Sequence, residues 1–285
     1  MRFSGIVQTF SDSAVVLLGH GSTLNSESSG PVYAHAAELR RAGLFAEVRE
    51  AFWKQAPHIS QVLGELKANR VFIVPMFIGE GYFSGEVIPE ALGFHTHSAQ
   101  GSRLLRGNQT WIYCRAVGTH ASMTRILLTR ARHVVEQFPF PRAPLPRDIS
   151  LFIAGHGTER SSRSGDAVQA QVEILRGLDM YGCVHGVFME QEPLIAQSYS
   201  LATTRHMVVI PFFISDGLHV TEDIPMMLGE PERIVRVRLT NGQWPWRNPT
   251  EMNGKLVWYS RSVGTEPGLT EVVLEMVTQA ADGNR

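Results

Sequence analysis

The chain has 285 residues, a formal net charge of −1 and 44% hydrophobic residues. These values are typical of a soluble globular protein, and the length leaves room for two domain cores. The near-zero charge gives no global reason to expect nucleic acid or an anionic membrane as a partner. Two cysteines, Cys114 and Cys183, form no CxxC pair, and neither a signal segment nor a long apolar run is evident, so we expect a cytoplasmic protein.

Short apolar strands alternate with amphipathic helices in the first half of the chain. Ala14–Leu18 is a continuous apolar run, as expected for a parallel strand buried on both faces. Pro57 opens a predicted helix at its first turn, and Pro75 indicates an edge or a bulge near the end of a strand. In chain order, the predicted strands are 14–18, 48–53, 71–78 and 111–117, and the predicted helices are 31–42, 57–66 and 122–137.

The second half repeats this order of elements. The alternation predicts an α/β fold in which each half has a mainly parallel sheet flanked by helices. The predicted strands are 150–154, 184–189, 207–214 and 255–260, and the predicted helices are 168–178, 193–203 and 269–280.

The two halves are related by an internal duplication. His20 in "GHGST" and His156 in "GHGTE" lie 136 positions apart (156 − 20). The same offset aligns 48–57 with 184–193, and 74–93 with 210–229. The last pair has 9 identities in 20 positions, against roughly one expected by chance. One offset over three separate blocks indicates that a whole domain was duplicated.

A proline-rich segment separates the halves and indicates an extended connector. We therefore predict an N-terminal domain at 1–138, a linker at 139–149 and a C-terminal domain at 150–285. The segment 231–254 is an insertion relative to the first half. Its apolar residues, including Trp244 and Trp246, either cover a cleft, or brace the domain interface, or belong to a packed surface loop, and we favour the loop.

Three candidate metal ligands follow strand ends in the second half: His156, Glu190 and His219. The carboxyl ends of parallel strands meet at one edge of a sheet, so these side chains are expected in one crevice. A single histidine after a strand is more often structural, but two imidazoles and a carboxylate together favour a divalent-metal site with open coordination positions. Glu222 and Asp223 either belong to the outer shell of this site or complement a helix dipole, and we favour the dipole role.

The first half provides an internal control for this interpretation. His20 matches His156, but Lys54 stands at the position of Glu190 and Phe83 at that of His219. Neither an ammonium group nor a phenyl ring can ligate a cation. We therefore expect one metal site, in the second half, and a degenerate copy in the first.

The sequence resembles the class II chelatases, in particular the CbiX/SirB-type sirohydrochlorin chelatases. The motifs that carry the resemblance are "GHGT" after a strand, "VFMEQEP" and "VIPFFISDGLHVTEDIP", with a glutamate 34 positions after the first histidine (190 − 156) and a second histidine 29 further on (219 − 190). The family's metal ligands carry over to His156, Glu190 and His219. The first-half segment 79–89 departs from the pattern because it lacks the family histidine.

The resemblance implies two fused CbiX-like domains with a cleft between them. It also implies ATP-independent insertion of a divalent metal into sirohydrochlorin or a related tetrapyrrole, in biosynthesis of the cobalamin or siroheme type. Co2+ is the first choice of metal, with Fe2+ or Ni2+ as alternatives. The alternative function is a noncatalytic metal- or tetrapyrrole-binding protein on the same fold.

The implied reaction needs a metal held on one side of the macrocycle and a base for two pyrrole N–H protons. A histidine near neutral pKa can ligate and later carry a proton. We assign His156 as ligand and proton acceptor, with Glu190 and His219 holding the ion, although either histidine could take the proton.

Sirohydrochlorin bears eight carboxylates, so we expect cationic side chains along the substrate site. The candidates are Arg160, Arg163 and Lys54, with His20 as a further contact, and for both arginines an ordinary solvated role is equally plausible. The expected partner is this small molecule, without nucleic acid or membrane. The expected state is a monomer or a weak homodimer.

Overall fold

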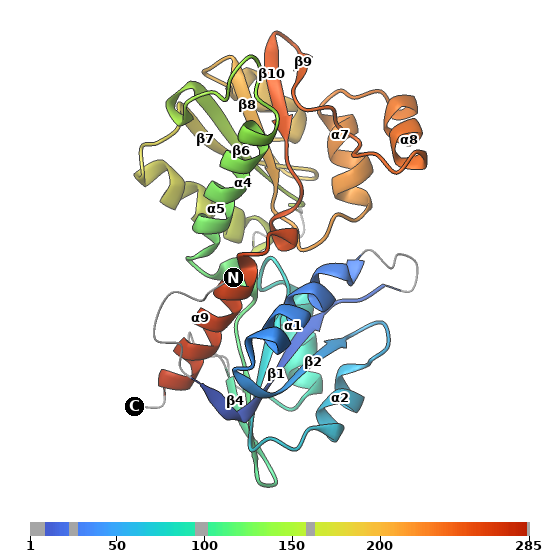
Figure 1. Cartoon of the computed structure of the whole chain (residues 1–285), viewed down its shortest axis with the longest axis vertical. Coiled ribbons are helices and arrows are strands. Elements are labelled where there is room, and N and C mark those ends of the chain that lie inside the picture. Colours follow the sequence, from blue (N-terminus) through green and yellow to red (C-terminus); the bar gives the residue numbers. More distant parts are fainter. Residues whose placement is uncertain (1–8, 23–27, 95–101, 158–162, 284–285) are drawn as a thin grey trace. The chain divides into compact units, whose positions relative to one another are not determined.

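The computed structural model describes residues 9–22, 28–94, 102–157 and 163–283 (Figure 1). The chain divides into two compact units: Met1–His120 with Pro267–Arg285, and Ala121–Glu266. Each unit contains a five-stranded sheet with flanking helices, and four of the five strands are parallel. The predicted α/β class with two similar, mainly parallel sheets is confirmed.

The sheet of the first unit has the order β2-β1-β3-β5-β4. The strands are β1 (Phe10–Gly19), β2 (Phe45–Phe52), β3 (Arg70–Pro75), β4 (Ser102–Arg106) and β5 (Gln109–Tyr113), and only β4 is antiparallel to its neighbour. The helical segments are α1 (Gly30–Ala42), α2 (Ile59–Glu65), the π-helical turn η2 (Phe83–Val87), α3 (Ile88–Ala91), the 3-10 turn η3 (Val117–Thr119) and, from the chain's end, α9 (Leu269–Asp282).

The sheet of the second unit has the equivalent order β7-β6-β8-β10-β9. The strands are β6 (Ile149–Gly155), β7 (Cys183–Phe188), β8 (His206–Pro211), β9 (Thr250–Met252) and β10 (Lys255–Tyr259), and β9 is antiparallel to β10. The helical segments are α4 (Met123–Gln137), η4 (Pro146–Asp148), α5 (Arg163–Gly177), η5 (Ile195–Gln197), α6 (Ser198–Leu201), the π-helical turn η6 (His219–Asp223), α7 (Ile224–Met227), α8 (Glu232–Thr240) and η7 (Val263–Thr265).

The equivalent strands β1 and β6 form the centre of the two sheets. Every residue of β6 is buried, and so is the run Ser13–Gly19 of β1. Both strands have a parallel neighbour on each side, so their backbone groups are paired while helices cover their two faces. This explains why their sequences are continuous apolar runs instead of an alternating pattern.

The terminal helix of each sequence half belongs to the other half's unit. Helix α4 follows the strands of the first half, but its buried face lies against β8, β10 and α5 of the second unit. Helix α9 follows the strands of the second half and lies against α1, β3 and η3 of the first unit. The compact units therefore differ from the predicted domains, which divide the chain at 139–149.

Two buried hydrogen bonds show that this exchange is reciprocal. Thr124 of α4 donates from Oγ1 to Gln171 of α5 at 2.6 Å. At the equivalent positions of the first unit, Thr270 of α9 pairs with His35 of α1 at 2.9 Å. The apolar faces of α4 and α9 are covered only in this arrangement, which a repeat analysis of the sequence cannot detect.

Several elements differ from the sequence-based expectation. Strands β4 and β9 were not predicted, because they are short and contain few apolar residues. Pro75 ends β3, which is a central strand and not an edge strand. The segment 231–254 contains α8 and β9, and its Trp246 is 2% exposed and donates from Nε1 to Val257 O at 3.1 Å. Trp246 thus packs on the core of its own unit, as the favoured interpretation predicts.

Among residues 9–22, 28–94, 102–157 and 163–283, no helix has both the length and the apolar content needed to cross a bilayer.

Two equivalent glycines sit in turns that touch the backbone of another loop. Gly264 in η7 donates its N–H to Phe213 O at 2.9 Å, and Gly118 in η3 donates to Phe77 O at 2.9 Å. A Cβ at Gly264 would lie 2.0 Å from Ile214 O, and one at Gly118 would lie 2.1 Å from Ile78 O. Only glycine allows these turns to approach so closely.

We expect Gly264→Ala to destabilise the second unit by about 1–3 kcal/mol, because its Cβ overlaps a carbonyl oxygen that cannot move freely. Gly118→Ala should destabilise the first unit similarly. Thermal unfolding followed by circular dichroism measures both effects. Gly177→Ala is the matched control, because a Cβ there meets nothing within 4 Å. An unchanged unfolding temperature for Gly264→Ala would show that the turn has room.

Candidate functional site

The candidate site lies at the carboxyl edge of the second unit's sheet. The chain leaves β6 in one direction to form β7 and returns on its other side to form β8, so the strand order switches at β6. Ligands of open α/β sheets bind at such switch points. His156 follows β6, Glu190 follows β7 and His219 follows β8, so the three predicted side chains surround this switch.

The two glycines beside His156 allow the turn after β6. Gly157 has φ +68°, and a Cβ there would lie 2.7 Å from Gln191 Cγ and 2.9 Å from Phe188 Cβ. A Cβ on Gly155 would lie 2.8 Å from Val168 Cγ2. The chain therefore turns sharply against the end of β7, while the side chain of His156 stays 42% exposed.

The backbone of Glu190 is tied directly to that of His156. The amide of Glu190 donates to His156 O at 3.1 Å. Its carboxylate oxygen Oε2 lies 3.8 Å from His156 Nδ1, and the side chain is 57% exposed. The position of Glu190 is therefore fixed, whereas its carboxylate is free to rotate into solvent.

His219 is the first residue of the π-helical turn η6. Ile224 donates its N–H to His219 O, five residues back, and Pro225 follows, which has no N–H with which to continue a normal helix. Such π turns occur frequently at functional sites. The turn places the ring of His219 edge-on to that of His156, with ring centroids 4.9 Å apart and an interplanar angle of 83°.

Both histidines are held through Nδ1. His156 Nδ1 lies 2.7 Å from Gly157 O, and because a carbonyl can only accept, this nitrogen carries the proton. His219 Nδ1 lies 2.7 Å from Asp223 Oδ2, a carboxylate that likewise accepts. In each neutral ring Nε2 keeps its lone pair, which is the arrangement found in metal-binding histidines. For Asp223 the contact corresponds to the outer-shell alternative, which the sequence had not favoured.

The donors are near one another but not closed around one point. Within the part of the chain that the structure describes, no three His, Cys, Asp or Glu side chains are grouped as a bound metal requires. Glu190 accounts for this, because its carboxylate lies on the Nδ1 side of His156. A rotation of this exposed side chain would be needed to bring all three donors to one ion.

The equivalent positions of the first unit adopt the same arrangement with different chemistry. Lys54 donates its amide to His20 O at 2.8 Å, as Glu190 does to His156. The ring of His20 is edge-on to that of Phe83, with centroids 5.2 Å apart, and Lys54 Nζ lies 5.1 Å from the Phe83 centroid. The backbone of the site has thus been kept, while two of its three donors are absent.

Burial lowers the pKa of His20 below its ordinary value, and the nearby Lys54 ammonium lowers the pKa further. The Gly21 carbonyl, which accepts from His20 Nδ1 at 2.9 Å, acts in the opposite direction. His20 is therefore a neutral, uncharged neighbour of the exposed Lys54 near neutral pH.

The residues that anchor the loop before His219 were not predicted from the sequence. Asp216 Oδ1 accepts from the Ser262 amide and Oδ2 accepts from Arg261 Nη1, both at 2.8 Å. The first unit has the same ion pair between Glu80 and Arg115, at 2.6 Å. The repeat contained the signal, because Asp216 and Glu80 share the offset of 136 and both are acidic.

The predicted tetrapyrrole contacts are only partly described. Arg160 lies outside the described residues, and Arg163 is the first residue of α5, with nothing described of its side chain. Lys54 and His20 both lie at the carboxyl edge of the first unit's sheet.

Comparison with known proteins identifies the family. The CbiX family model matches the chain twice, at residues 14–134 and 150–280. The chain belongs to the CbiX family. It is 37% identical over 279 residues to a protein of Halobacterium salinarum named "Probable sirohydrochlorin cobaltochelatase", which covers 94% of this chain and 91% of that protein.

Solved structures show the same fold. DR2241 from Deinococcus radiodurans, described as a multi-domain protein with structural similarity to chelatases, matches with a TM-score of 0.76 and 24% identity. The match covers 94% of this chain but only 55% of that one. SirB from Bacillus subtilis with Fe3+ matches with a TM-score of 0.65 and 15% identity, over 95% of this chain and 96% of that one.

We expect Lys54→Gln to raise the pKa of His20, because the variant removes a nearby positive charge. The pKa should stay below the ordinary histidine value, since burial is the larger cause of its shift. Titration of the histidine ring signals by NMR measures the change. Lys67→Gln is the control, a lysine of the same unit that makes no contribution to the pKa of His20. A fall in the His20 pKa in Lys54→Gln would contradict this account.

Proposed function

We propose that this CbiX family member is a metal chelatase that inserts a divalent metal ion into sirohydrochlorin or a close tetrapyrrole. One observation carries the proposal: two imidazoles with free Nε2 lone pairs and one carboxylate surround the switch point of the second unit's sheet. The 37% identical relative named as a probable sirohydrochlorin cobaltochelatase supports this substrate.

In this proposal His156, Glu190 and His219 hold the metal ion as it arrives. The imidazoles ligate through Nε2, and Glu190 rotates from the Nδ1 side of His156 to complete the site. Three protein ligands leave coordination positions open, so the ion can pass to the four nitrogens of the macrocycle. The side chains are 42%, 57% and 48% exposed, which leaves them accessible to a large planar substrate.

The macrocycle loses two N–H protons as one divalent ion enters, so charge is conserved at the ring. We assign His156 as the first proton acceptor. Once the metal has left Nε2, that nitrogen has a free lone pair, while the Nδ1–H bond to the Gly157 carbonyl stabilises the resulting imidazolium. His219 is equally oriented by Asp223 and is the alternative acceptor.

The carboxylates of the substrate call for cations around the site. We propose Lys54, Arg160 and Arg163 for this role, with His20 as a neutral contact. Lys54 is exposed and has no carboxylate partner among the described residues, so its ammonium is available to an anionic ligand. We propose that a cleft brings such groups to one substrate.

Co2+ is the metal that we propose first, with Fe2+ or Ni2+ as alternatives, because the relative is named for cobalt while two imidazoles and a carboxylate accept all three. We further propose that no ATP is consumed, that the product enters cobalamin- or siroheme-type biosynthesis, and that the enzyme works in the cytoplasm as a monomer or weak homodimer, without nucleic acid or membrane.

The central test is the loss of metal insertion in His156→Ala, Glu190→Gln and His219→Ala. We expect each variant to lower the rate of Co2+ insertion by at least about 100-fold, since each removes one of three ligands or the proton acceptor. The decrease of metal-free sirohydrochlorin absorbance measures the rate. Isothermal titration with Co2+ measures metal binding. For that measurement His20→Ala is the matched control, because its unit lacks the other two donors.

Wild-type protein that binds Co2+ and sirohydrochlorin, yet inserts metal no faster than the spontaneous reaction, would favour the noncatalytic binding protein instead. Equal Co2+ affinity in His156→Ala and His20→Ala would contradict the assignment of a metal site to the second unit.

Asp223→Asn should weaken Co2+ binding by about 10–100-fold, because an amide holds the His219 ring less firmly and no longer raises its basicity. Glu222→Gln is the control, since Glu222 has no contact with His219 among the described residues. The dissociation constants for Co2+ of both variants decide the question. If the two variants bind Co2+ equally well, the role of Asp223 is to complement the helix dipole and not to orient His219.

A further inference from the structure

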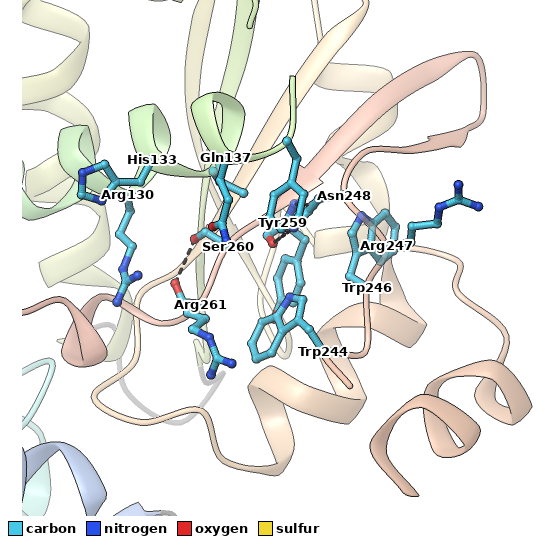
Figure 2. Close-up of a pocket in the computed structure, with 12 residues that line it drawn as sticks. Arg130, His133, Gln137, Trp244, Trp246, Arg247, Asn248, Tyr259, Ser260 and Arg261 are labelled. Carbon is cyan, nitrogen blue, oxygen red and sulfur yellow. Dashed lines mark hydrogen bonds between the residues drawn. The ribbon is translucent and has the colours of Figure 1, made fainter. Parts of the chain in front are cut away.

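A cavity of about 540 Å³ lies within the second unit (Figure 2). It is formed by one side of α4, by the inserted segment and by the residues that end β10. Its lining residues are Arg130, His133, Val134, Gln137, Phe138, Trp244, Trp246, Arg247, Asn248, Tyr259, Ser260 and Arg261.

Part of the cavity lining lies at the same sheet edge as the candidate metal ligands. Strand β10 is parallel to β8, and β8 is parallel to β6, so Tyr259 and the residues after it lie at the carboxyl edge. Two strand spacings separate β10 from β6, a distance of roughly 10 Å. One extended planar ligand can therefore reach both His156 and the cavity.

Direct contacts connect the cavity to the loop that carries His219. Arg261 Nη1 donates to Asp216 at 2.8 Å, and the Tyr259 hydroxyl donates to Val220 O at 2.7 Å. Asp216 and Val220 lie on either side of His219 in the sequence. The wall of the cavity and the candidate metal ligand are thus positioned by the same loop.

One wall of the cavity is a stack of flat groups. Trp244 lies parallel to Tyr259, with ring centroids 5.8 Å apart and an interplanar angle of 20°. Figure 2 shows Arg261 beside Trp244, and its guanidinium carbon lies 4.7 Å from the indole centroid. Trp244 is only partly buried, so the exposed part of its indole can contact the edge of a planar ligand.

The charges on the lining are all potentially positive. Arg130, Arg247, Arg261 and His133 line the cavity, and no acidic side chain is among the lining residues. Glu266 and Asp216 lie behind it, with side chains 7% and 11% exposed. A ligand in the cavity therefore meets cations first.

Arg130 has a side chain that is only 13% exposed, the least exposed of the cavity's ion-paired arginines. Its Nη2 donates to Thr265 Oγ1 at 2.7 Å, while Nε lies 3.2 Å from Glu266 Oε2 but outside hydrogen-bond geometry. Burial lowers the pKa of this guanidinium, and Glu266 only partly opposes the effect. An additional anion would stabilise its charge.

Part of the cavity lining has no equivalent in the first half, although Arg261 corresponds to Arg115. The offset between halves is 136 at Ile214 and Ile78 but 146 at Gly264 and Gly118, so the second half has ten more residues between these points (146 − 136). With the larger offset, Arg130 corresponds to Met276 and Glu266 to His120. The buried ion pair therefore occurs only in the unit that carries the metal-ligand set.

We propose that this cavity is a carboxylate subsite for the tetrapyrrole substrate, in which Arg130 and Arg261 bind a peripheral carboxylate and Trp244 supports the edge of the ring. The inference rests on the proposed chelatase function and names the part of the site that selects a polycarboxylate substrate. A free carboxylate or phosphate ion has the same chemistry, but it would not need the aromatic wall or the nearby metal ligands.

The test compares the steady-state kinetics of wild type with those of one double variant, which carries both Arg130→Met and Glu266→His. This pair reproduces Met276 and His120 of the first unit and leaves no buried acid without its partner. We expect the KM for sirohydrochlorin to rise about tenfold, as for loss of a charge-assisted hydrogen bond, with kcat and the KM for Co2+ unchanged. Trp244→Leu should raise the same KM, and Arg132→Met on the exposed side of α4 is the matched control.

The fully esterified substrate provides the second arm. With its carboxylates blocked, wild type and the double variant should have equal KM values, and circular dichroism confirms that each variant is folded. Unchanged KM for sirohydrochlorin in both cavity variants, with insertion intact, would overturn the subsite and leave the chelatase proposal standing. Altered inhibition by free phosphate or citrate without a change in that KM would show a site for free anions and also overturn it.

If wild type inserts no metal, the proposed function fails by itself. Equilibrium dialysis of metal-free sirohydrochlorin then still decides the subsite, since a weaker dissociation constant in the double variant supports it and an equal one rejects it.

Discussion

The arrangement of parallel strands around β6 determines everything else in the candidate site. Because β7 and β8 lie on opposite sides of β6 and run in the same direction, three loops that are distant in sequence end at one edge. Short backbone contacts then fix the loops, including the bond from the Glu190 amide to His156 O. These loops place His156, Glu190 and His219 near one another at that edge.

Comparison of the two duplicated units distinguishes the backbone geometry of the site from the chemistry of its side chains. The first unit keeps the same strand order, the same π-helical turn and the same bond from residue 54 to His20 O. Yet Phe83 fills the place of a histidine with a ring of similar size and orientation. The backbone geometry of the switch point is thus the same where two of the three donor residues are absent, and the chemistry of each unit is set by a few side chains placed on it.

The sequence predicted the fold class and the location of His156, Glu190 and His219 after strand ends at one sheet edge, because strand ends are encoded locally and by the repeat. That these three side chains bind one ion stays a prediction. The sequence did not predict the pairing of Asp223 with His219, which depends on a π-helical turn that an ordinary helical period does not describe. Nor did it locate the anchor formed by Asp216 and Arg261, which joins positions far apart in sequence. The destination of α4 was also hidden, because an amphipathic face does not specify which sheet will cover it.

The reciprocal placement of α4 and α9 has a consequence for how such a chain can originate and be divided. A polypeptide with only one of these halves would leave the groove beside its third strand uncovered, and a second copy of itself would be the natural donor of the missing helix. When two copies are joined head to tail, this exchange of helices takes place within one molecule. A single proteolytic cut in the proline-rich connector would therefore yield two fragments that each still hold a piece of the other's core.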